Sequence, residues 1–303
     1  MRAGIDDAEL DLLAEAFRKT MSSASGPVLD RALGQLGWRD LLAEFPATAV
    51  PLTFRLLGET GAHAPLLNDV LLTAAGREPG GTVPLPYAGG SWVVWERTDG
   101  PSTALDGEVP LRRLTAGRAA VDPAADGSAT QDGQAALTVD AAVLAAGRRA
   151  VGWWLLGTGR AMLALARAHA VDRVQFGRPI ASFQAVRHKL AETLVALDGA
   201  EAALTAADEL ATAGGQAAPG ADFDDVELAS LLAKAASGQA ALTAARHCQQ
   251  VLGGIGFTAE HPLHIHVKRA LVLDGLLGSA RELTREAGRR VITAGVAPRL
   301  IEL

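Results

Sequence analysis

Four long stretches of apolar residues at helical spacing fill the second half of the chain, and they constrain its fold more than any other feature. They run over 143–170, 184–213, 226–252 and 264–292. Apolar side chains that recur every three to four residues form a stripe along a helix, and that stripe must be buried against other helices. A glycine-rich break from Gly214 to Gly220 separates two of the stretches. The pattern predicts an up-and-down bundle of four helices.

The first half of the chain combines shorter helical patterns with a β-prone region. Leu10 to Phe17 follow helical spacing after Asp6 and Asp7, which can cap a helix, and further helical patterns follow up to Thr60. Glycine and proline then separate short β-prone pieces, which lie at 82–85, 91–95 and 109–111. We therefore expect a mainly α protein with a small β module. Its expected parts are an N-terminal helical domain (1–75), a β-rich middle module (76–138) and the four-helix bundle (139–303).

Composition excludes several classes of function. Hydrophobic residues make up 49% of the 303 residues, which is enough for a large core. The net charge of −6 disfavours a nucleic-acid or anionic-membrane surface, since neither would be attracted electrostatically. No apolar run approaches the roughly 20 residues that span a bilayer, and the first residues lack the apolar stretch of a signal peptide. With Cys248 as the sole cysteine, an intrachain disulfide is impossible, and a cytoplasmic protein is expected.

Two segments at helix ends carry chemistry that could bind a ligand. The first, Asp172 to Ile180, breaks a helix at Gly177 and Pro179 and contains Arg173 and Phe176. An arginine can offer a planar fork of donors to a phosphate, and an aromatic ring a flat face to a heterocycle. The second runs from Gln249 to Phe257 and holds three glycines in four positions, which allow a ligand to approach the backbone. Each segment alone is more typical of a plain turn at a helix end than of a ligand site.

Other candidate sites are weaker. His261, His264 and His266 suggest a metal site, but helical positions two apart point to different faces and no acid completes a ligand set. Cys248 beside His247 reads as a buried, unreactive thiol. Gly157 and Gly159 lie within a helical stripe and predict close packing between helices.

Taken together, the two segments and their order resemble the C-terminal domain of the acyl-CoA dehydrogenase family. The resemblance rests on Arg173-x-x-Phe176-Gly177, then Phe183-Gln184, then Gln250-x-x-Gly253-Gly254-x-Gly256-Phe257. It covers roughly 140–292 and is fainter at the N-terminus. It implies a helix–sheet–helix fold with a shortened β-domain, and FAD as the cofactor.

The resemblance also implies which residues bind FAD. In this family the cofactor lies across a subunit interface and the neighbouring bundle holds its diphosphate end. By position, Arg173 would bind the diphosphate and Phe176 would lie against the cofactor. Gln184 and Gln250 would donate amide hydrogen bonds, and Gly253 and Gly254 would leave room for the ligand.

The catalytic acid of the family has no counterpart at the expected positions. Leu277 stands where the proton-abstracting glutamate usually precedes a glycine, and the alternative position of the base near the start of the first bundle helix holds Gly147, Arg148 and Arg149. Ser279 replaces a family threonine that contacts the flavin, and Arg281 replaces a glutamine. We therefore expect no catalytic residue in this chain and no metal site.

This combination resembles the non-catalytic chain of the heteromeric acyl-CoA dehydrogenases of bacterial steroid degradation. It implies a catalytic partner subunit, an α2β2 hetero-oligomer with FAD between unlike chains, and an acyl-CoA substrate bound in the partner. Two alternatives remain. Asp274, three residues before Leu277, could act as a relocated base in a self-sufficient enzyme, or the chain could be a non-enzymatic scaffold.

Overall fold

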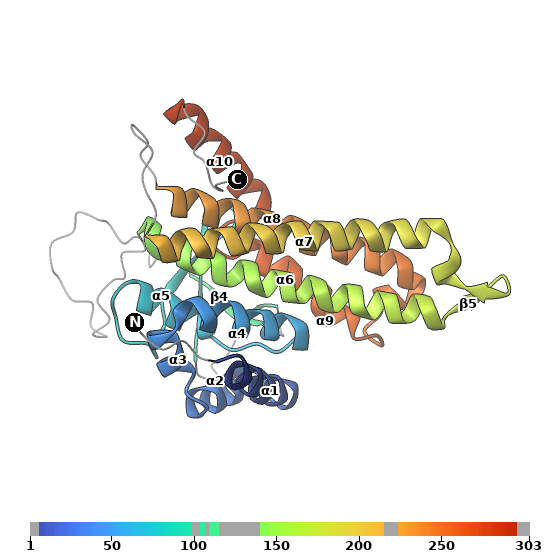
Figure 1. Ribbon diagram of the computed structural model, residues 1–303, viewed down its shortest axis with the longest axis horizontal. Coiled ribbons are helices and arrows are strands. Elements are labelled where there is room, and N and C mark those ends of the chain that lie inside the picture. The colour runs from blue at the N-terminus through green and yellow to red at the C-terminus, as the bar shows by residue number, and fades with distance from the viewer. Residues whose placement is uncertain (1–5, 98–103, 107–108, 115–139, 215–223, 296–303) are drawn as a thin grey trace.

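The computed structural model describes residues 6–97, 104–106, 109–114, 140–214 and 224–295. The expected domain ends at residues 1–5, 115–139 and 296–303, and most of the glycine-rich break, lie outside the described residues. Within the described part, helices dominate and the strands form a four-stranded sheet and a two-stranded hairpin, which confirms the predicted fold class (Figure 1).

The N-terminal part consists of five helices. They are α1 (Asp7–Ser23), α2 (Gly26–Gln35), α3 (Trp38–Glu44), α4 (Pro46–Thr60) and α5 (Leu66–Ala74). Pro46 begins α4, because proline suits the first turn of a helix, where its missing N–H is not needed. Helix α5 was not predicted, because its residues Leu66 to Leu72 are all buried and therefore show no amphipathic period.

The sheet is antiparallel, with strands in the order β1-β2-β4-β3. The strands are β1 (Pro84–Tyr87), β2 (Ser91–Trp95), β3 (Ala104–Asp106) and β4 (Val109–Arg113). Leu85, Val93 and Leu111 are buried and join the large core that extends into the helices.

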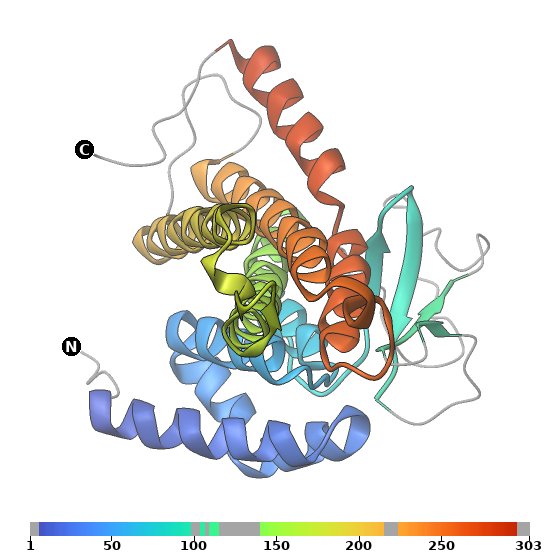
Figure 2. The same ribbon diagram turned by 90° about the vertical axis from the view of Figure 1, so that its right-hand side faces the viewer.

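The C-terminal part is built from long helices, seen end-on in Figure 2. They are α6 (Ala141–Asp172), α7 (Gln184–Ala213), α8 (Asp225–Leu252), α9 (Leu263–Gly275) and α10 (Ala280–Ala294). The first three match the predicted stretches closely. Between α6 and α7 lie the short hairpin β5 (Val174–Gln175) and β6 (Arg178–Pro179) and the 3-10 turn η1 (Ile180–Ser182), and η2 (Gly253–Phe257) follows α8.

The fourth predicted helix, 264–292, was wrong as one continuous helix. The chain turns sharply after Gly275, where Leu277 has φ 59° and Gly278 has φ 101°, so the helical path ends. Ser279 then caps α10, which leaves the bundle at an angle (Figures 1 and 2). We call the segment from Asp274 to Ser279 the α9–α10 corner.

Close packing of α4 on α6 confirms the prediction made for the glycines of α6. A Cβ on Gly157 would lie 2.1 Å from the carbonyl oxygen of Arg55, and one on Gly58 would lie 2.4 Å from the carbonyl oxygen of Trp154. The two backbones therefore approach too closely for any side chain at these points. This contact fixes the N-terminal helices on the bundle.

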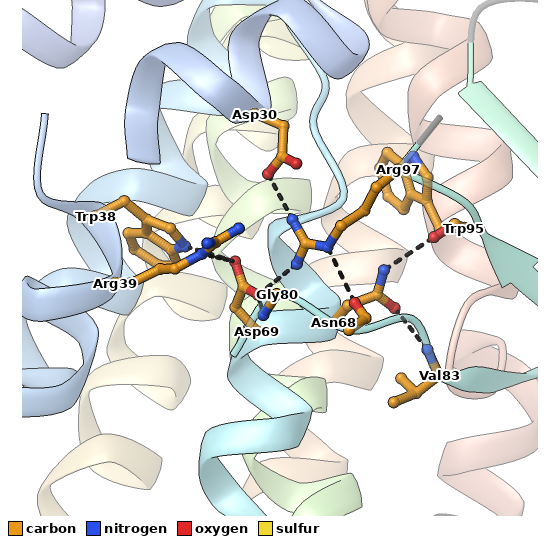
Figure 3. Close-up of polar contacts among 10 residues, drawn as sticks. Asp30, Trp38, Arg39, Asn68, Asp69, Gly80, Val83, Trp95 and Arg97 are labelled. Carbon is orange, nitrogen blue, oxygen red and sulfur yellow. Dashed lines mark hydrogen bonds and ion pairs between the residues drawn. The ribbon is translucent and has the colours of Figure 1, made fainter. Parts of the chain in front are cut away.

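A buried ionic cluster joins the N-terminal helices to the sheet (Figure 3). The guanidinium of Arg97, just after β2, binds Asp30 of α2 at 2.6 Å and also pairs with Asp69 of α5. Asp69 is fully buried and accepts further hydrogen bonds from the Trp38 indole, at 3.1 Å, and the Gly80 amide, at 2.7 Å. Burial raises the pKa of Asp69, and the charge of Arg97 opposes that shift.

Asn68, the neighbour of Asp69, ties the same helix to the end of β2 and to the residue that precedes β1. Its amide donates to the carbonyl of Trp95 at 2.9 Å, and its side-chain oxygen accepts from Val83 at 3.4 Å (Figure 3). Buried polar groups with this many partners specify one docking arrangement between helix and sheet.

Candidate functional site

Arg173 and Phe176 lie in the hairpin that connects α6 to α7. Arg173 follows the last residue of α6, and its carbonyl accepts a hydrogen bond from Ile180 at 2.8 Å, which closes the hairpin. Phe176 and Gly177 form the tip, with φ of 54° and 77°. The Phe176 ring is 91% exposed, so the chain holds a large aromatic face in solvent.

A second aromatic ring supports that face. The centroid of Phe183 lies 6.1 Å from that of Phe176, with the planes at 84°, and the guanidinium of Arg178 stacks on Phe183 at 4.4 Å. Gln184 follows Phe183 as the first residue of α7 and is exposed. The hairpin thus presents an aromatic ring, cations and an amide together.

Gln250, Gly253 and Gly254 lie where α8 ends and η2 begins. Gly253 has φ 65° and ψ −141°, a conformation that only glycine adopts readily. A Cβ added to Gly253 or Gly254 would meet no atom of the chain within 4 Å, so the space beside both backbones is open. Gln250 is exposed next to them.

Both segments lie at the same end of the bundle (Figure 1). His169 in the last turn of α6 and His261 just before α9 face each other there, with ring centroids 6.5 Å apart. The structure therefore gathers all six predicted cofactor residues at one end of the bundle. Whether each of them contacts a cofactor stays a prediction.

The donors gathered at this end suit a diphosphate joined to a planar group. A guanidinium offers two parallel donors to phosphate, amide side chains can donate to polar edges, and open glycines allow close approach. Five of the six residues are exposed and Gly253 is half-buried, so they form an open surface. A ligand bound here would need a second surface to enclose it.

Leu277 is buried at the α9–α10 corner, with 1% of its surface exposed. Its N–H donates to the carbonyl of Pro86 at 2.8 Å, and its own carbonyl accepts from Arg148 Nε at 3.3 Å. A Cβ placed on Gly147 would lie 2.8 Å from Leu277 Cδ1 and 2.7 Å from Leu71 Cδ2. The side chains of Leu277 and Leu71 thus pack directly on Gly147.

Leu277 and Gly147, which is one of the three residues at the alternative position of the acid, therefore meet in space, although they are far apart in the sequence. Neither of them is an acid, and Leu71 of α5 occupies the space beside them. A leucine cannot accept a proton, and the weakly acidic α-proton of a thioester requires a positioned base.

The carboxylate of Asp274, the alternative base, faces α8 and points away from the contact between Leu277 and Gly147. Its Oδ1 accepts the backbone N–H of Ala280 at 3.0 Å and would lie 2.4 Å from a Cβ on Gly238. The carboxylate therefore stabilises the start of α10 and packs on a glycine of α8. These contacts weigh against a catalytic role.

Ser279 and Glu282 form a capping box at the start of α10. The Ser279 hydroxyl donates to Glu282 at 2.7 Å, and Glu282 also accepts the N–H of Gly89 at 2.9 Å. The hydrogen bonds from Gly89 and Ser279 lower the pKa of Glu282. Ser279 thus acts within this chain as a helix cap, while Arg281 is exposed.

Lys234 of α8 was not identified from the sequence. Its side chain is fully buried and donates to the carbonyls of Asp274 and Gly278, at both sides of the corner. Burial lowers its pKa to about 7, although the charge of Asp274 opposes that shift. The sequence did contain a signal for this buried charge, since Lys234 lies three residues after Leu231 within an apolar stripe.

The remaining candidates are buried or dispersed. His266 is buried, which lowers its pKa to about 4, and burial raises the pKa of the Cys248 thiol to about 12. No group of three or more residues that could hold a metal ion occurs in the described part of the chain. Likewise, no described helix is both long and apolar enough to cross a bilayer.

Comparison with known proteins gives a family match over the bundle. The family model described as "Acyl-CoA dehydrogenase, C-terminal domain" matches residues 137–292. Acyl-CoA dehydrogenase FadE34 of Mycobacterium tuberculosis is 37% identical over 305 residues, covering 96% of this chain but only 39% of that protein. The chain thus spans well under half the length of this relative.

Solved structures share the whole fold at low sequence identity. The steroid ACAD variant Tcur3481-Tcur3483 has a TM-score of 0.67 at 17% identity, covering 96% of this chain and 99% of that one. A chain of the ChsE4-ChsE5 complex of M. tuberculosis has a TM-score of 0.64 at 18% identity, covering 99% and 100%. A Mycobacterium smegmatis glutaryl-CoA dehydrogenase in complex with FADH2 has a TM-score of 0.62 at 16% identity, covering 97% and 96%.

Proposed function

The chain belongs to the acyl-CoA dehydrogenase family, and from this premise we propose that it is the subunit of an FAD-dependent acyl-CoA dehydrogenase that holds the cofactor without supplying the catalytic acid. One observation carries the proposal. Leu277, at the usual position of the base, packs on Gly147, one of the three residues at the alternative position, whereas the donors for a diphosphate remain exposed together.

FAD is the cofactor that the family and the FADH2-bound neighbour indicate. When bound, it accepts the hydride from the β-carbon of the thioester. In this chain Arg173 would bind the diphosphate and Phe176 would cover a planar part of the cofactor. Gln184 and Gln250 would donate hydrogen bonds from either side, and the open backbone at Gly254 would allow the ligand to approach.

The missing acid implies a partner. A catalytic acyl-CoA dehydrogenase subunit would contribute the base, bind the acyl-CoA and cover the exposed end of this bundle, in an α2β2 assembly. The ChsE4-ChsE5 complex and the steroid dehydrogenase among the structural neighbours support such a partner and a steroid-sized acyl group. The acidic net charge of −6 fits a cytoplasmic enzyme that binds neither nucleic acid nor membrane.

The test is flavin content. The chain is coexpressed with an acyl-CoA dehydrogenase subunit that carries the glutamate, and the flavin absorbance of the purified complex is measured per subunit. We expect bound FAD that requires both chains. A colourless complex would contradict the proposal and favour a scaffold, while activity of this chain alone would favour a self-sufficient enzyme.

Two variants assign the site. Gly254→Val fills space that only a ligand would occupy, so it should leave folding unchanged and lower flavin content, as should Arg173→Ala. Gly288→Val on α10 is the matched control, because a Cβ there also meets nothing within 4 Å. Normal flavin content in Gly254→Val would show that the cofactor does not bind beside η2.

A further inference from the structure

A pair of histidines joins the two segments that carry the predicted cofactor residues. His169 lies in the last turn of α6, one turn before Arg173, and its carbonyl accepts the Arg173 N–H at 2.9 Å. His261 lies between η2, which contains Gly253 and Gly254, and the start of α9. The ring centroids of the two histidines are 6.5 Å apart and the ring planes meet at 84°, so the edge of one ring meets the face of the other.

The ring of His261 is held in its neutral form. Its Nδ1 accepts the backbone N–H of Leu263 at 3.1 Å. A ring nitrogen that accepts a hydrogen bond carries no proton, so the neutral ring has its proton on Nε2. Protonation of Nδ1 would place two N–H groups against each other. Uptake of a proton by His261 therefore costs a hydrogen bond.

The ring of His169 has no such constraint. It is half-buried and forms no hydrogen bond with a described residue. Burial lowers the pKa of His169, the neighbouring His261 and the charge of Arg173 lower it further, and Asp172 opposes the shift. The ring is therefore uncharged in the free chain at neutral pH. Since it can take up a proton without breaking a bond, it is the ring of the pair that titrates.

The other segments around the pair add little charge. Arg178 of β6, a strand that packs on α6, directs its guanidinium at the Phe183 ring, with 4.4 Å to the ring centroid. The segment η2 contains no charged residue, and Glu260, which follows it, is exposed. The charge of His169 is thus set mainly by the three neighbours named above.

A diphosphate bound by Arg173 would reverse the electrostatics at His169. Its negative charges would offset the charge of Arg173, which otherwise opposes protonation of the ring one turn away. A charged imidazole beside a phosphate is also a strong hydrogen-bond donor. Binding of the anion and binding of the proton would therefore favour each other.

We propose that His169 takes up a proton when the diphosphate of FAD binds, and that it then serves as a second cation beside Arg173. His261 stays neutral and positions the ring of His169. The proton comes from the solvent, so the affinity for FAD increases as the pH falls. This inference rests on the proposed function, because it concerns the same cofactor, but it assigns a residue outside the six predicted ones.

The first experiment measures the dissociation constant of FAD in the coexpressed complex at pH 5.5 and pH 8, from the fluorescence of the released flavin. We expect binding to be about 5-fold or more tighter at pH 5.5. His169→Gln should bind FAD at both pH values as weakly as the wild type does at pH 8, because an amide cannot take up the proton. His169→Lys should bind tightly at both, because its amine stays charged, whereas a merely structural role would not be rescued by lysine.

His188→Gln is the matched control. His188 is exposed on α7 and forms no hydrogen bond, ion pair or ring contact with a described residue. The variant also removes one titrating ring and should keep the wild-type pH dependence. The proposal would be overturned if the wild type bound FAD more weakly at pH 5.5, if His169→Gln kept the pH dependence, or if the control lost it.

A second measurement does not need the partner subunit. The pKa of His169 is followed by NMR in the purified full chain, with and without millimolar ADP-ribose, whose diphosphate diester keeps its charges over this pH range. The ligand should raise the pKa of His169. Arg173→Ala should raise it without ligand and abolish the further shift. His261→Asn should also raise it, and asparagine can still accept the N–H two residues further along the chain.

The two measurements separate this inference from the proposed function. A colourless complex, together with a pKa of His169 that ADP-ribose raises, would contradict the proposed function and support the assignment of His169 to a diphosphate. A complex that contains flavin but binds it independently of pH would support the proposed function and overturn the role of His169. A pKa of His169 that ADP-ribose leaves unchanged would overturn that role as well.

Discussion

Restoring a glutamate at residue 277 tests whether the position of the missing acid is closed by apolar packing. Leu277 is 1% exposed, and its side chain packs on Gly147 beside the side chain of Leu71. In Leu277→Glu the new carboxyl would replace a methyl group among apolar side chains. We expect the variant to fold less stably and to remain without dehydrogenase activity.

The size of the effect follows from desolvation. A carboxyl buried without a partner has a pKa of about 8 to 9, compared with about 4.3 when the chain is unfolded. Because the folded-state pKa is raised, no penalty applies below about pH 4, and stability is lost as the pH rises above that value. At about 1.4 kcal/mol per pH unit, the penalty reaches about 3 to 4 kcal/mol at pH 7.

The assay is urea unfolding followed by tryptophan fluorescence at pH 5 and pH 7. Relative to the wild type, Leu277→Glu should lose about 2 to 3 kcal/mol more at pH 7 than at pH 5. Leu277→Gln has the same shape and no titration, so it controls for lost packing. The reasoning would be refuted if Leu277→Glu showed the same pH dependence as this control, or if it gained dehydrogenase activity, since the carboxyl would then be solvated or paired with Arg148.

Two further predictions concern buried charges. Burial lowers the pKa of Lys234 in the folded chain to about 7. Between about pH 7 and pH 10 the lysine therefore binds a proton in the unfolded chain but not in the folded one, so the free energy of unfolding should rise with pH over this range. In chemical denaturation, Lys234→Met should abolish this rise. Arg97→Gln should cost about 3 to 5 kcal/mol in the same assay, because it leaves Asp30 and buried Asp69 without their shared cation. Arg39→Gln removes a 3.9 Å contact of a half-exposed arginine with Asp69 and should cost less than about 1 kcal/mol; equal losses in the two variants would contradict the role given to Arg97.

Most of the helical fold was predictable because strong local signals mark its ends. The predicted stretch 184–213 coincides with α7, which begins after Phe183 and ends at Gly214 in a left-handed conformation. The break between α9 and α10 was not predictable in the same way. Leu276 and Leu277 continue the apolar period of the helix, so the pattern conceals a turn that tertiary contacts impose.

In the candidate site, too, features marked by local sequence could be predicted and those that depend on tertiary contacts could not. Motif residues such as Arg173 and Gly254 could be proposed from the sequence, because their spacing within short segments is informative. The contact between Gly147 and Leu277 could not be found that way, since it joins α6 to the α9–α10 corner across 130 residues. Lys234 was missed because its partners are backbone carbonyls, which leave no trace in the sequence.

Those carbonyl contacts explain how the corner keeps its shape without an acid. Leu277 occupies a left-handed conformation, which costs a residue with a side chain about 1 kcal/mol, yet a glycine is not used there. The conformation is held by the main chain: its N–H bonds to Pro86, Arg148 bonds to its carbonyl, and Lys234 bonds to the carbonyl of Gly278. Because none of these bonds involves the side chain of residue 277, that side chain can change from acid to leucine without altering the turn. The α9–α10 corner can therefore keep its fold when residue 277 is no longer an acid. The loss of stability expected for Leu277→Glu arises from desolvation of the carboxyl rather than from the backbone.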